Sequence, residues 1–407
     1  MFLRALIILT FSTLSLWGFN VSAAPRELHS EFKIPSSGVL RERALFWVQI
    51  YSKYSTQQGL LHDSRYPNVI YEEMDFEKPK RNRPAAVRAA KERYKKILMR
   101  LHDSHVEENP HPLDDLSKDE RRVYDLFANI HEPNKFLAAS HYKRVRFQLG
   151  QKDRFLEGLK ESGRYLPFME EIFIKRGLPF ELTRLPFVES SFNTRAVSKV
   201  GASGIWQFMP TTALHFIEIG PAVDERNDPL RATEAASELL KLNYKSLHHW
   251  PLAVTAYNHG RTSLMKAVRK LGTDSLEDLI VLNKAKTFGF ASSNFFACLL
   301  AAIEVERNVK TYFGDLDRER PHLFYEVKLP QSILIKDLIS FMGLKRSEVL
   351  DLNPGFTLDG IRSKVRLPKG YRLRLATRGS GTRADTARKE RIFKAGFAKI
   401  PKAYKGK

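Results

Sequence analysis

A single glutamate in an apolar helical setting is the first candidate for chemistry. In the stretch RLPFVESSFN, Glu189 follows Leu185 by four residues, and Phe192 comes three residues later. A helix through this stretch places the Glu189 carboxylate on or beside its own apolar face. Burying an unpaired carboxylate is costly and usually raises its pKa, so one interpretation is a general acid. The alternative is a structural ion pair with Arg184 or Arg195.

A loop marked by glycines follows in the sequence AVSKVGASGIWQFMPTTA. Gly201 and Gly204 predict a tight turn in which the backbone closely approaches another part of the chain. The next residues, 206–209, are Trp-Gln-Phe-Met, and aromatic faces beside an amide suit a sugar with its apolar ring faces and hydroxyls. A phosphate loop is the competing interpretation, but the Gly-Lys-Ser/Thr element is missing. Taken alone, Trp206 and Phe208 are also typical core residues.

A third stretch, AVTAYNHG, is typical of a helix that ends at Gly260. Tyr257 and Asn258 could point from this helix end into a groove. The stretch on its own indicates only a helix C-terminus, so its meaning depends on the other two stretches.

Together, the three stretches resemble the catalytic domain of lytic murein transglycosylases, bacterial enzymes with a goose-type-lysozyme-like fold that cleave peptidoglycan. The resemblance rests on FVESSFN, SKVGASGIWQFMPTTA and AYNHG in this order and covers about residues 140–310. It points in particular to the membrane-bound type D enzymes, and it implies that Glu189 is catalytic. It also implies a set of substrate-binding residues, namely Ser190, Ser198, Gln207, Phe208, Met209, Tyr257 and Asn258.

The sequence departs from the family at one position near the last long helix. Relatives often have Glu-Thr-Arg-x-Tyr there, whereas residues 291–295 are Ala-Ser-Ser-Asn-Phe. If Phe295 replaces that tyrosine, a hydroxyl near the catalytic carboxylate is missing.

The chemistry implied by the resemblance needs only one carboxylate, whereas most glycosidases use two. Glu181, Glu218, Asp224 and Glu225 are candidates for a second one, but no motif places any of them. We therefore expect Glu189 to protonate the glycosidic oxygen and then to take the proton of the muramic acid 6-hydroxyl. The product would be a 1,6-anhydromuramyl end, and the substrate's N-acetyl group could stabilise the developing positive charge.

The elements that must position these residues are mainly helical. We expect a mainly α chain with a helical lysozyme-like catalytic domain, a mostly helical N-terminal region and a small α+β module resembling LysM. The first half of that module departs from LysM, because KLPQSIL stands where a Gly-Asp-Thr turn is usual. The expected segments are a signal peptide at 1–23, an N-terminal region at 24–140, the catalytic domain at 141–318, the LysM-like module at 323–376 and a basic disordered tail at 377–407.

The N-terminus predicts export to the periplasm or cell envelope. Arg4 precedes an apolar run that is short for a membrane span, and Val21-Ser22-Ala23 suits cleavage after Ala23. The alternative is an uncleaved anchor. The only cysteine is Cys298, so no internal disulfide forms, and a buried small hydrophobe is its simplest role.

The formal charge of +21 predicts an anionic partner. We expect peptidoglycan glycan strands as the substrate, with the basic tail attracted to anionic wall polymer or a membrane surface. Nucleic acid is not expected, because the chain has an export signal and no aromatic-basic recognition motif. No metal site and no cofactor are expected, and the sequence does not define an oligomeric state.

Two other functions remain open at this point. One is a peptidoglycan-binding protein whose lysozyme-like domain is catalytically weak or inactive, which the change at Phe295 favours. The other is a muramidase that hydrolyses the same bond to a reducing sugar, as a true lysozyme does.

Overall fold

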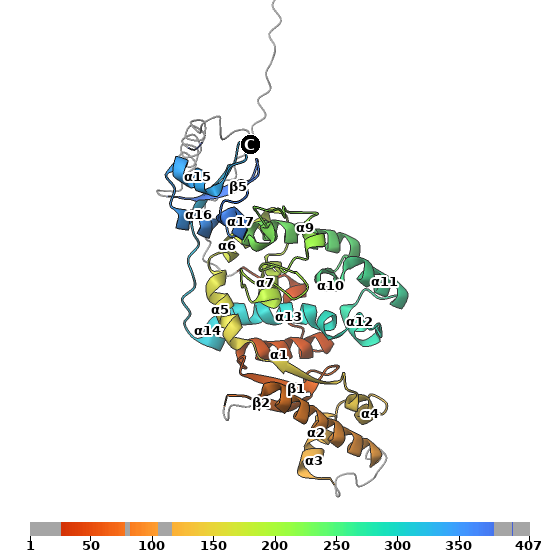
Figure 1. The fold of residues 1–407 in the computed structure, drawn as a ribbon. Coiled ribbons are helices and arrows are strands. Elements are labelled where there is room, and N and C mark those ends of the chain that lie inside the picture. The colour runs from red at the N-terminus through yellow and green to blue at the C-terminus, as the bar shows by residue number, and fades with distance from the viewer. Residues whose placement is uncertain (1–25, 78–81, 105–115, 378–392, 394–407) are drawn as a thin grey trace, which may run out of the picture. The chain divides into compact units, whose positions relative to one another are not determined.

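A computed structural model describes residues 26–77, 82–104, 116–377 and 393, and helices dominate it, so the predicted mainly α fold is confirmed (Figure 1). The chain divides into two compact units. The larger unit contains residues 28–219 and 225–321. The smaller one contains residues 26 and 27, residues 220–224 and the described residues from 322 onward. The predicted signal peptide at 1–23 lies outside the described residues.

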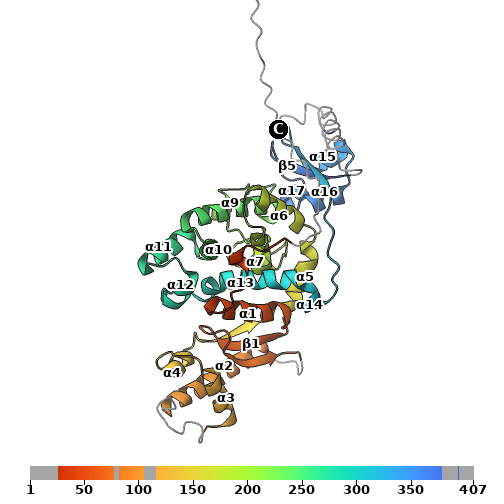
Figure 2. The same cartoon turned by 180° about the vertical axis from the view of Figure 1, so that it is seen from behind.

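The larger unit is built on two long buried helices. Helix α1 (Val39–Ser52) lies along α13 (Phe290–Arg307), as both views show (Figures 1 and 2). In α13 every residue from 294 to 303 is buried, because its apolar run covers all sides of the helix. A 3-10 turn at Ser30–Phe32 precedes α1.

An N-terminal lobe within this unit combines a small sheet with three helices. Strands β1 (Gln58–Asp63), β2 (Ile70–Asp75) and β3 (Val145–Leu149) form an antiparallel sheet in the order β2-β1-β3, and Leu60 pairs with both Glu73 and Gln148. The lobe has its own apolar core, to which the helices contribute. These helices are α2 (Arg83–Asp103), α3 (Lys118–Leu126) and α4 (Lys135–Ser140).

The boundary expected at residues 140 and 141 therefore differs from the structure. Strand β3 lies beyond that boundary, yet it completes the sheet of the N-terminal lobe. Residue periodicity could not reveal this, because the partner strand is more than eighty residues away in the sequence.

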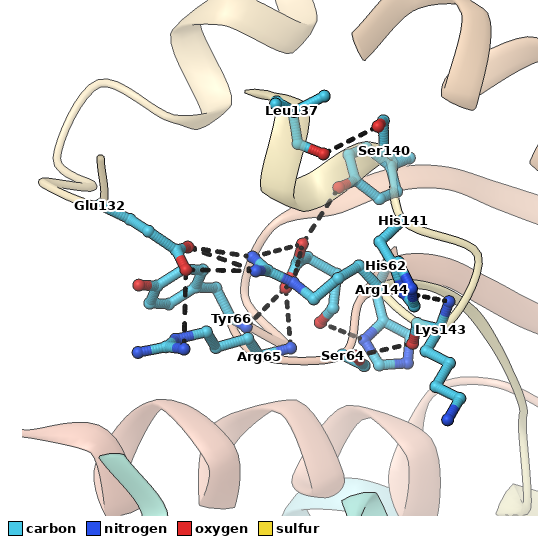
Figure 3. A network of polar contacts seen from close by, with 12 residues as sticks. His62, Ser64, Arg65, Tyr66, Glu132, Leu137, Ser140, His141, Lys143 and Arg144 are labelled. Carbon is cyan, nitrogen blue, oxygen red and sulfur yellow. Dashed lines mark hydrogen bonds and ion pairs between the residues drawn. The ribbon is translucent and has the colours of Figure 1, made fainter. Parts of the chain in front are cut away.

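A buried ion-pair network stabilises the N-terminal lobe (Figure 3). Asp63, at the end of β1, accepts hydrogen bonds from Arg144 Nε (3.0 Å) and from the backbone N–H groups of Arg65 (2.7 Å) and Tyr66 (2.9 Å). Glu132 lies 3.3 Å from Arg144 and 3.6 Å from Arg65. The network joins β1 to the start of β3 and to the chain between α3 and α4, so its role is structural.

The remaining helices of the larger unit carry the three sequence motifs. Asp228 caps α9 by accepting hydrogen bonds from the backbone N–H groups of Leu230 and Arg231. Helix α10 ends at Gly260 (φ 89°), as the sequence predicted. The elements are α5 (Lys152–Ser162), α6 (Leu166–Lys175), a 3-10 turn (Phe180–Arg184), α7 (Leu185–Ser190), α8 (Pro210–Ala213), a 3-10 turn (Glu225–Asn227), α9 (Pro229–Leu247), α10 (Trp250–His259), α11 (Arg261–Leu271), α12 (Leu276–Leu282) and α14 (Val309–Phe313).

The smaller unit combines two strands with three short helices between them. Strands β4 (Phe324–Lys328) and β5 (Arg372–Ala376) pair antiparallel. The helices are α15 (Ile335–Met342), α16 (Arg346–Leu352) and α17 (Leu358–Ile361). This order alone does not show a LysM module, so the LysM assignment stays a prediction.

The smaller unit also includes chain from outside the predicted module. Ala222 and Val223 are buried in its core, and the Asp224 N–H donates to the Gly355 carbonyl oxygen (2.8 Å). Phe393, within the tail expected to be disordered, is buried in the same core. The other residues of that tail, except Thr377, lie outside the described residues. None of the helices in the described ranges is long and apolar enough to span a membrane.

Candidate active site

Glu189 lies near the end of the short helix α7, next to a strained turn. Ser191 (φ 52°) and Phe192 (φ 57°) both adopt the left-handed conformation, which side chains other than glycine rarely adopt. Phe192 is fully buried, so packing holds this turn in place. Gly158 of α5 leaves room for it, since a Cβ at that position would lie 2.4 Å from the Ser191 carbonyl oxygen. Strain of this kind tends to cluster at functional sites.

The Glu189 side chain is half-buried, and burial raises its pKa to about 8. Arg184, one of the two expected ion-pair partners, instead contacts Glu306 (3.2 Å) and Glu170. Within the described ranges, neither Arg184 nor Arg195 pairs with Glu189. The structure therefore leaves this carboxyl accessible, without a cation, and protonated near neutral pH.

Three neutral acids lie within electrostatic reach of Glu189. Burial, Cys298 and then the charge of Glu189 raise the pKa of Tyr51, while burial and then Glu189 raise that of Tyr257. Burial also raises the pKa of the Cys298 thiol, and the charge of Glu189 raises it further. Burial is the cause of the raised pKa of Glu189, and within the described residues no second carboxylate contributes to that shift.

The carboxylates considered as partners have other roles or positions. Glu181 is almost fully buried and accepts a hydrogen bond from the His29 backbone N–H (2.7 Å). Glu225 accepts one from the Glu218 backbone N–H (2.9 Å). Asp224 belongs to the smaller unit. In the part of the chain that the structure describes, no cluster of His, Cys, Asp and Glu could hold a metal ion.

The glycine-marked loop has the close approach that the sequence predicted. Gly204 (φ 75°) lies so near the Arg226 backbone that a Cβ would come within 1.8 Å of the Arg226 carbonyl oxygen. Gly201 adopts φ 87°, and its carbonyl oxygen accepts a hydrogen bond from Arg226 Nη1 (2.8 Å). Ser203 forms antiparallel bridges with Val197 and Phe208, which close the loop.

Hydrogen bonds join α7 to this loop. Ser190 Oγ donates to the Ile205 carbonyl oxygen (3.0 Å), and Ser198 Oγ accepts from the Ala202 backbone N–H (2.9 Å). Gln207, itself at φ 48°, donates from Nε2 to the carbonyl oxygens of Gly204 (2.9 Å) and Ala196 (3.2 Å). The amide group expected to bind substrate therefore also holds the loop in shape.

The two aromatic residues of the loop belong to the core. Trp206 is fully buried, stacks on Phe173 with ring centroids 5.9 Å apart, and donates from Nε1 to Thr233 Oγ1 (2.8 Å). Phe208 is 2% exposed and packs edge-on against Tyr257. Phe208 thus supports the site from behind instead of offering a face to a ligand, contrary to the sequence prediction. Met209, by contrast, is exposed.

The third motif brings Tyr257 to the same place. Its hydroxyl donates to the Trp206 carbonyl oxygen (2.8 Å), and its ring stacks parallel to that of Phe295. Phe295 supplies no hydroxyl, whereas its stacking partner Tyr257 carries one. Asn258 is exposed and accepts a hydrogen bond from Ser292 Oγ (3.1 Å).

The structure therefore connects Glu189, Ser190, Gln207 and Tyr257 through one short helix, one loop and one helix end. The sequence missed the ring contacts that join Tyr51 of α1 to Phe155 of α5 and, through Phe155, to Phe187 of α7. It also missed the Ser292 hydroxyl, which bridges Asn258 and His259 Nδ1 (3.1 Å). No local pattern could identify these residues, because only the packing of distant helices brings them to the site.

A known protein family matches the part of the chain that contains this site. Residues 170–280 match the family described as Transglycosylase SLT domain. The match includes α7 with Glu189, the glycine-marked loop and the end of α10. It excludes α1 and α13.

Two curated proteins are similar to part of this chain. A protein of Alteromonas sp. (strain M-1) named for tributyltin chloride resistance is 33% identical over 30% of this chain and 60% of its own length. The membrane-bound lytic murein transglycosylase D of Escherichia coli (strain K12) is 39% identical over 23% of this chain and 22% of its own length. The chain thus covers less than two thirds of either relative.

Among solved structures, the 70 kDa soluble lytic transglycosylase of Escherichia coli aligns with 52% of this chain and 34% of its own, at 18% identity. The TM-score of 0.27 is too low to support a conclusion.

Proposed function

We propose that this chain, which carries a transglycosylase SLT domain and resembles lytic murein transglycosylase D within it, is an exported peptidoglycan lytic transglycosylase. Its target would be the β-1,4 bond between N-acetylmuramic acid and N-acetylglucosamine. The observation that carries the proposal is Glu189, an accessible carboxyl without a cation whose pKa burial raises to about 8. A general acid needs a pKa near the working pH, and this one remains protonated at pH 7.

In the proposed reaction, protonated Glu189 first donates its proton to the glycosidic oxygen, and the bond to the anomeric carbon breaks. The ionised Glu189 then accepts the proton of the muramic acid 6-hydroxyl as that oxygen attacks the anomeric carbon. One proton leaves Glu189 and one returns, so no water is consumed. The absence of a second carboxylate acting on Glu189 supports this route over two-carboxylate hydrolysis.

The residues around Glu189 have distinct proposed roles. Ser190, Ser198 and Gln207 shape the loop beside Glu189, and Gln207 keeps its carbonyl oxygen as an acceptor for substrate hydroxyls. Met209 and Asn258 are exposed and suited to contact a sugar. Tyr257 connects the loop to α10 through its bond to Trp206.

The test is incubation of purified peptidoglycan with the mature protein, followed by mass spectrometry of the released muropeptides. The proposal expects products with 1,6-anhydromuramyl ends. Reducing ends would identify a lysozyme-type muramidase instead. Binding to peptidoglycan without any released fragment would identify an inactive wall-binding protein, for which Phe295 is the favouring observation.

We also propose that the C-terminal region raises affinity for the wall. The sequence after residue 376 contains ten Lys and Arg residues and only two acidic ones. Attraction by exposed charges weakens as the screening length falls from about 10 Å at 0.1 M salt to about 3 Å at 1 M. Truncation after residue 376 should therefore remove the salt-sensitive part of binding to sacculi in a pull-down. Equal binding by both forms at both salt concentrations would contradict this role.

A further inference from the structure

A chain of hydrogen bonds joins α11, the end of α10 and the start of α13, and it terminates on Asn258. Ser263 Oγ of α11 lies 3.1 Å from His259 Nε2, and His259 Nδ1 lies 3.1 Å from Ser292 Oγ of α13. Ser292 Oγ in turn donates to Asn258 Oδ1 (3.1 Å). Ser292 is buried and His259 is half-buried, whereas Asn258 is exposed. The chain therefore connects the packed interior with an exposed amide of the third motif.

The number of protons available sets the direction of each hydrogen bond. Ser292 has one hydroxyl proton, which goes to Asn258 Oδ1, so Ser292 can only accept from His259. His259 Nδ1 must then carry a proton. In the neutral ring Nε2 carries none, so it accepts the hydroxyl proton of Ser263. Burial lowers the pKa of His259, which favours the neutral ring.

The surrounding elements hold this chain of hydrogen bonds in place. Phe288 packs edge-on against the His259 ring, with ring centroids 5.2 Å apart. Ser292 lies in the first turn of the buried helix α13. The end of α10 is fixed by Tyr257, whose hydroxyl donates to the Trp206 carbonyl oxygen (2.8 Å). Side chains on rigid, packed elements are held more precisely than those on loops.

The arrangement decides which atom Asn258 offers to a ligand. A side-chain amide has one acceptor oxygen and one NH₂ group with two donors. The oxygen already accepts from Ser292, and within the described ranges the NH₂ group has no hydrogen-bond partner. An exposed donor group whose orientation is fixed from behind suits an acceptor oxygen, of which a glycan carries many.

We propose that Ser292 and His259 are positioning residues that orient Asn258, so that its NH₂ group binds an acceptor oxygen of the glycan. The inference rests on the proposed function in taking Asn258 as a residue that contacts the substrate. It goes further by assigning the atom of Asn258 that binds and the two residues that orient it.

The opposite proton position on His259 would give the opposite result. If Nε2 carried the ring proton, Nδ1 would accept the hydroxyl proton of Ser292. Ser292 could then only accept from Asn258, whose amide would be turned and would offer its oxygen to a ligand. The nitrogen of His259 that carries the proton therefore reports which atom of Asn258 faces the glycan.

The experiment compares Ser292→Ala, Ser292→Thr and Ser293→Ala with the wild type, all as full-length proteins. Ser293 is the matched control, because its hydroxyl donates to the Phe290 carbonyl oxygen (3.2 Å) and takes no part in the chain of hydrogen bonds. The first readout is nitrogen-15 NMR of the His259 ring at a pH where the ring is neutral, assigned by the signals that His259→Gln removes. The second is kcat and KM for the cleavage of soluble glycan strands.

The wild type should carry the His259 proton on Nδ1. Ser292→Ala removes both the acceptor of that proton and the donor to Asn258, so the proton should no longer be confined to Nδ1. KM should rise about fivefold with kcat within about twofold of the wild type, because one oriented hydrogen bond to the substrate is lost. Ser292→Thr keeps a hydroxyl and should restore both readouts, and Ser293→Ala should change neither.

Three results would overturn the proposal. These are a wild-type His259 proton on Nε2, an unchanged KM in Ser292→Ala, and an equal rise of KM in Ser293→Ala. If Ser292→Ala does not fold, the ring measurement on the wild type still decides the orientation of Asn258.

Failure of the inference is distinguishable from failure of the proposed function, because the ring measurement needs no turnover. If the wild type released no anhydro product but carried the His259 proton on Nδ1, only the proposed function would fall. If the wild type cleaved peptidoglycan but carried that proton on Nε2, only the positioning roles would fall.

Discussion

The turn around Glu189 and the ion-pair network around Glu306 each contain a glutamate, but the pKa values of the two glutamates shift in opposite directions. Glu306 of α13 is buried too, but Arg184 (3.2 Å) and Arg318 (2.8 Å) flank it. Although burial alone would raise the pKa of Glu306, the two arginines hold it below its usual range. No cation among the described residues pairs with Glu189, and burial raises its pKa to about 8. The difference separates an acid that stabilises the fold from an acid free to exchange a proton.

The largest expected effect is on catalysis at Glu189. Glu189→Gln keeps the shape of the side chain but cannot donate a proton, so the release of muropeptides should fall by a factor of about 10³ or more. The melting temperature followed by circular dichroism should not fall, because no ion pair is lost. Release at a near wild-type rate by the folded variant would show that another group is the acid.

The largest expected loss of stability comes from the network. Glu306→Ala removes one of the two carboxylates that pair with the buried Arg184 guanidinium, and breaking a buried pair from one side costs about 3–5 kcal/mol. Denaturant unfolding measures this loss, while activity per folded molecule should remain close to wild type. Glu304→Ala, on the same helix, is a suitable control, since Glu304 is less buried and its carboxylate accepts hydrogen bonds from two neutral groups, those of Asn308 and Tyr312. Equal losses of unfolding free energy in Glu306→Ala and Glu304→Ala would contradict a special stabilising role for the buried pair at Glu306.

The pH dependence of stability should have opposite signs at the two acids. The folded-state pKa of Glu189 is raised, so its contribution is fully present below the unfolded value of 4.5 and is lost as the pH rises toward about 8. The folded-state pKa of Glu306 is lowered, so its contribution is present above 4.5 and is lost as the pH falls below that value.

Melting temperatures across this range check both signs. Glu189→Gln should gain stability relative to the wild type as the pH rises from 5 to 9. Glu306→Gln should be less stable than the wild type at neutral pH, and this difference in melting temperature should shrink as the pH falls into the acid range. A constant difference between Glu189→Gln and the wild type over the whole range would mean that Glu189 titrates normally.

The smallest expected effect concerns the loop beside Glu189. Gln207→Ala removes two hydrogen bonds to loop carbonyls, which should cost about 1–2 kcal/mol in unfolding free energy. Activity per folded molecule should fall about tenfold, because the loop loses its shape. Met209→Ala, at an exposed position, serves as the control for stability. Unchanged activity in folded Gln207→Ala would show that this amide is purely structural.

The sequence could predict the parts of the site that are encoded locally. Glu189, the close approach at Gly204 and the helix end after Tyr257 all lie within short motifs, and the structure connects them as expected. The mixture of strands and helices in the smaller unit is likewise encoded locally, and it agrees with the α+β module expected there.

The features that sequence could not predict depend on distant packing. The pairing of β3 with β1, the burial of Val223 in the smaller unit and the stacking of Tyr51 on Phe155 all join residues far apart in the chain. Phe208 was misassigned for the same reason, because an aromatic residue beside a glycine turn looks alike whether it faces a ligand or the core.

The central claim is that Glu189 transfers a proton out and back without consuming water. Digestion of purified peptidoglycan in heavy-oxygen water, followed by mass spectrometry of the muropeptides, tests it most directly. The account predicts fragments with 1,6-anhydromuramyl ends, lighter than the hydrolysis products by one water and free of the heavy isotope. Fragments with one heavy oxygen at a reducing end would contradict it and identify a hydrolase.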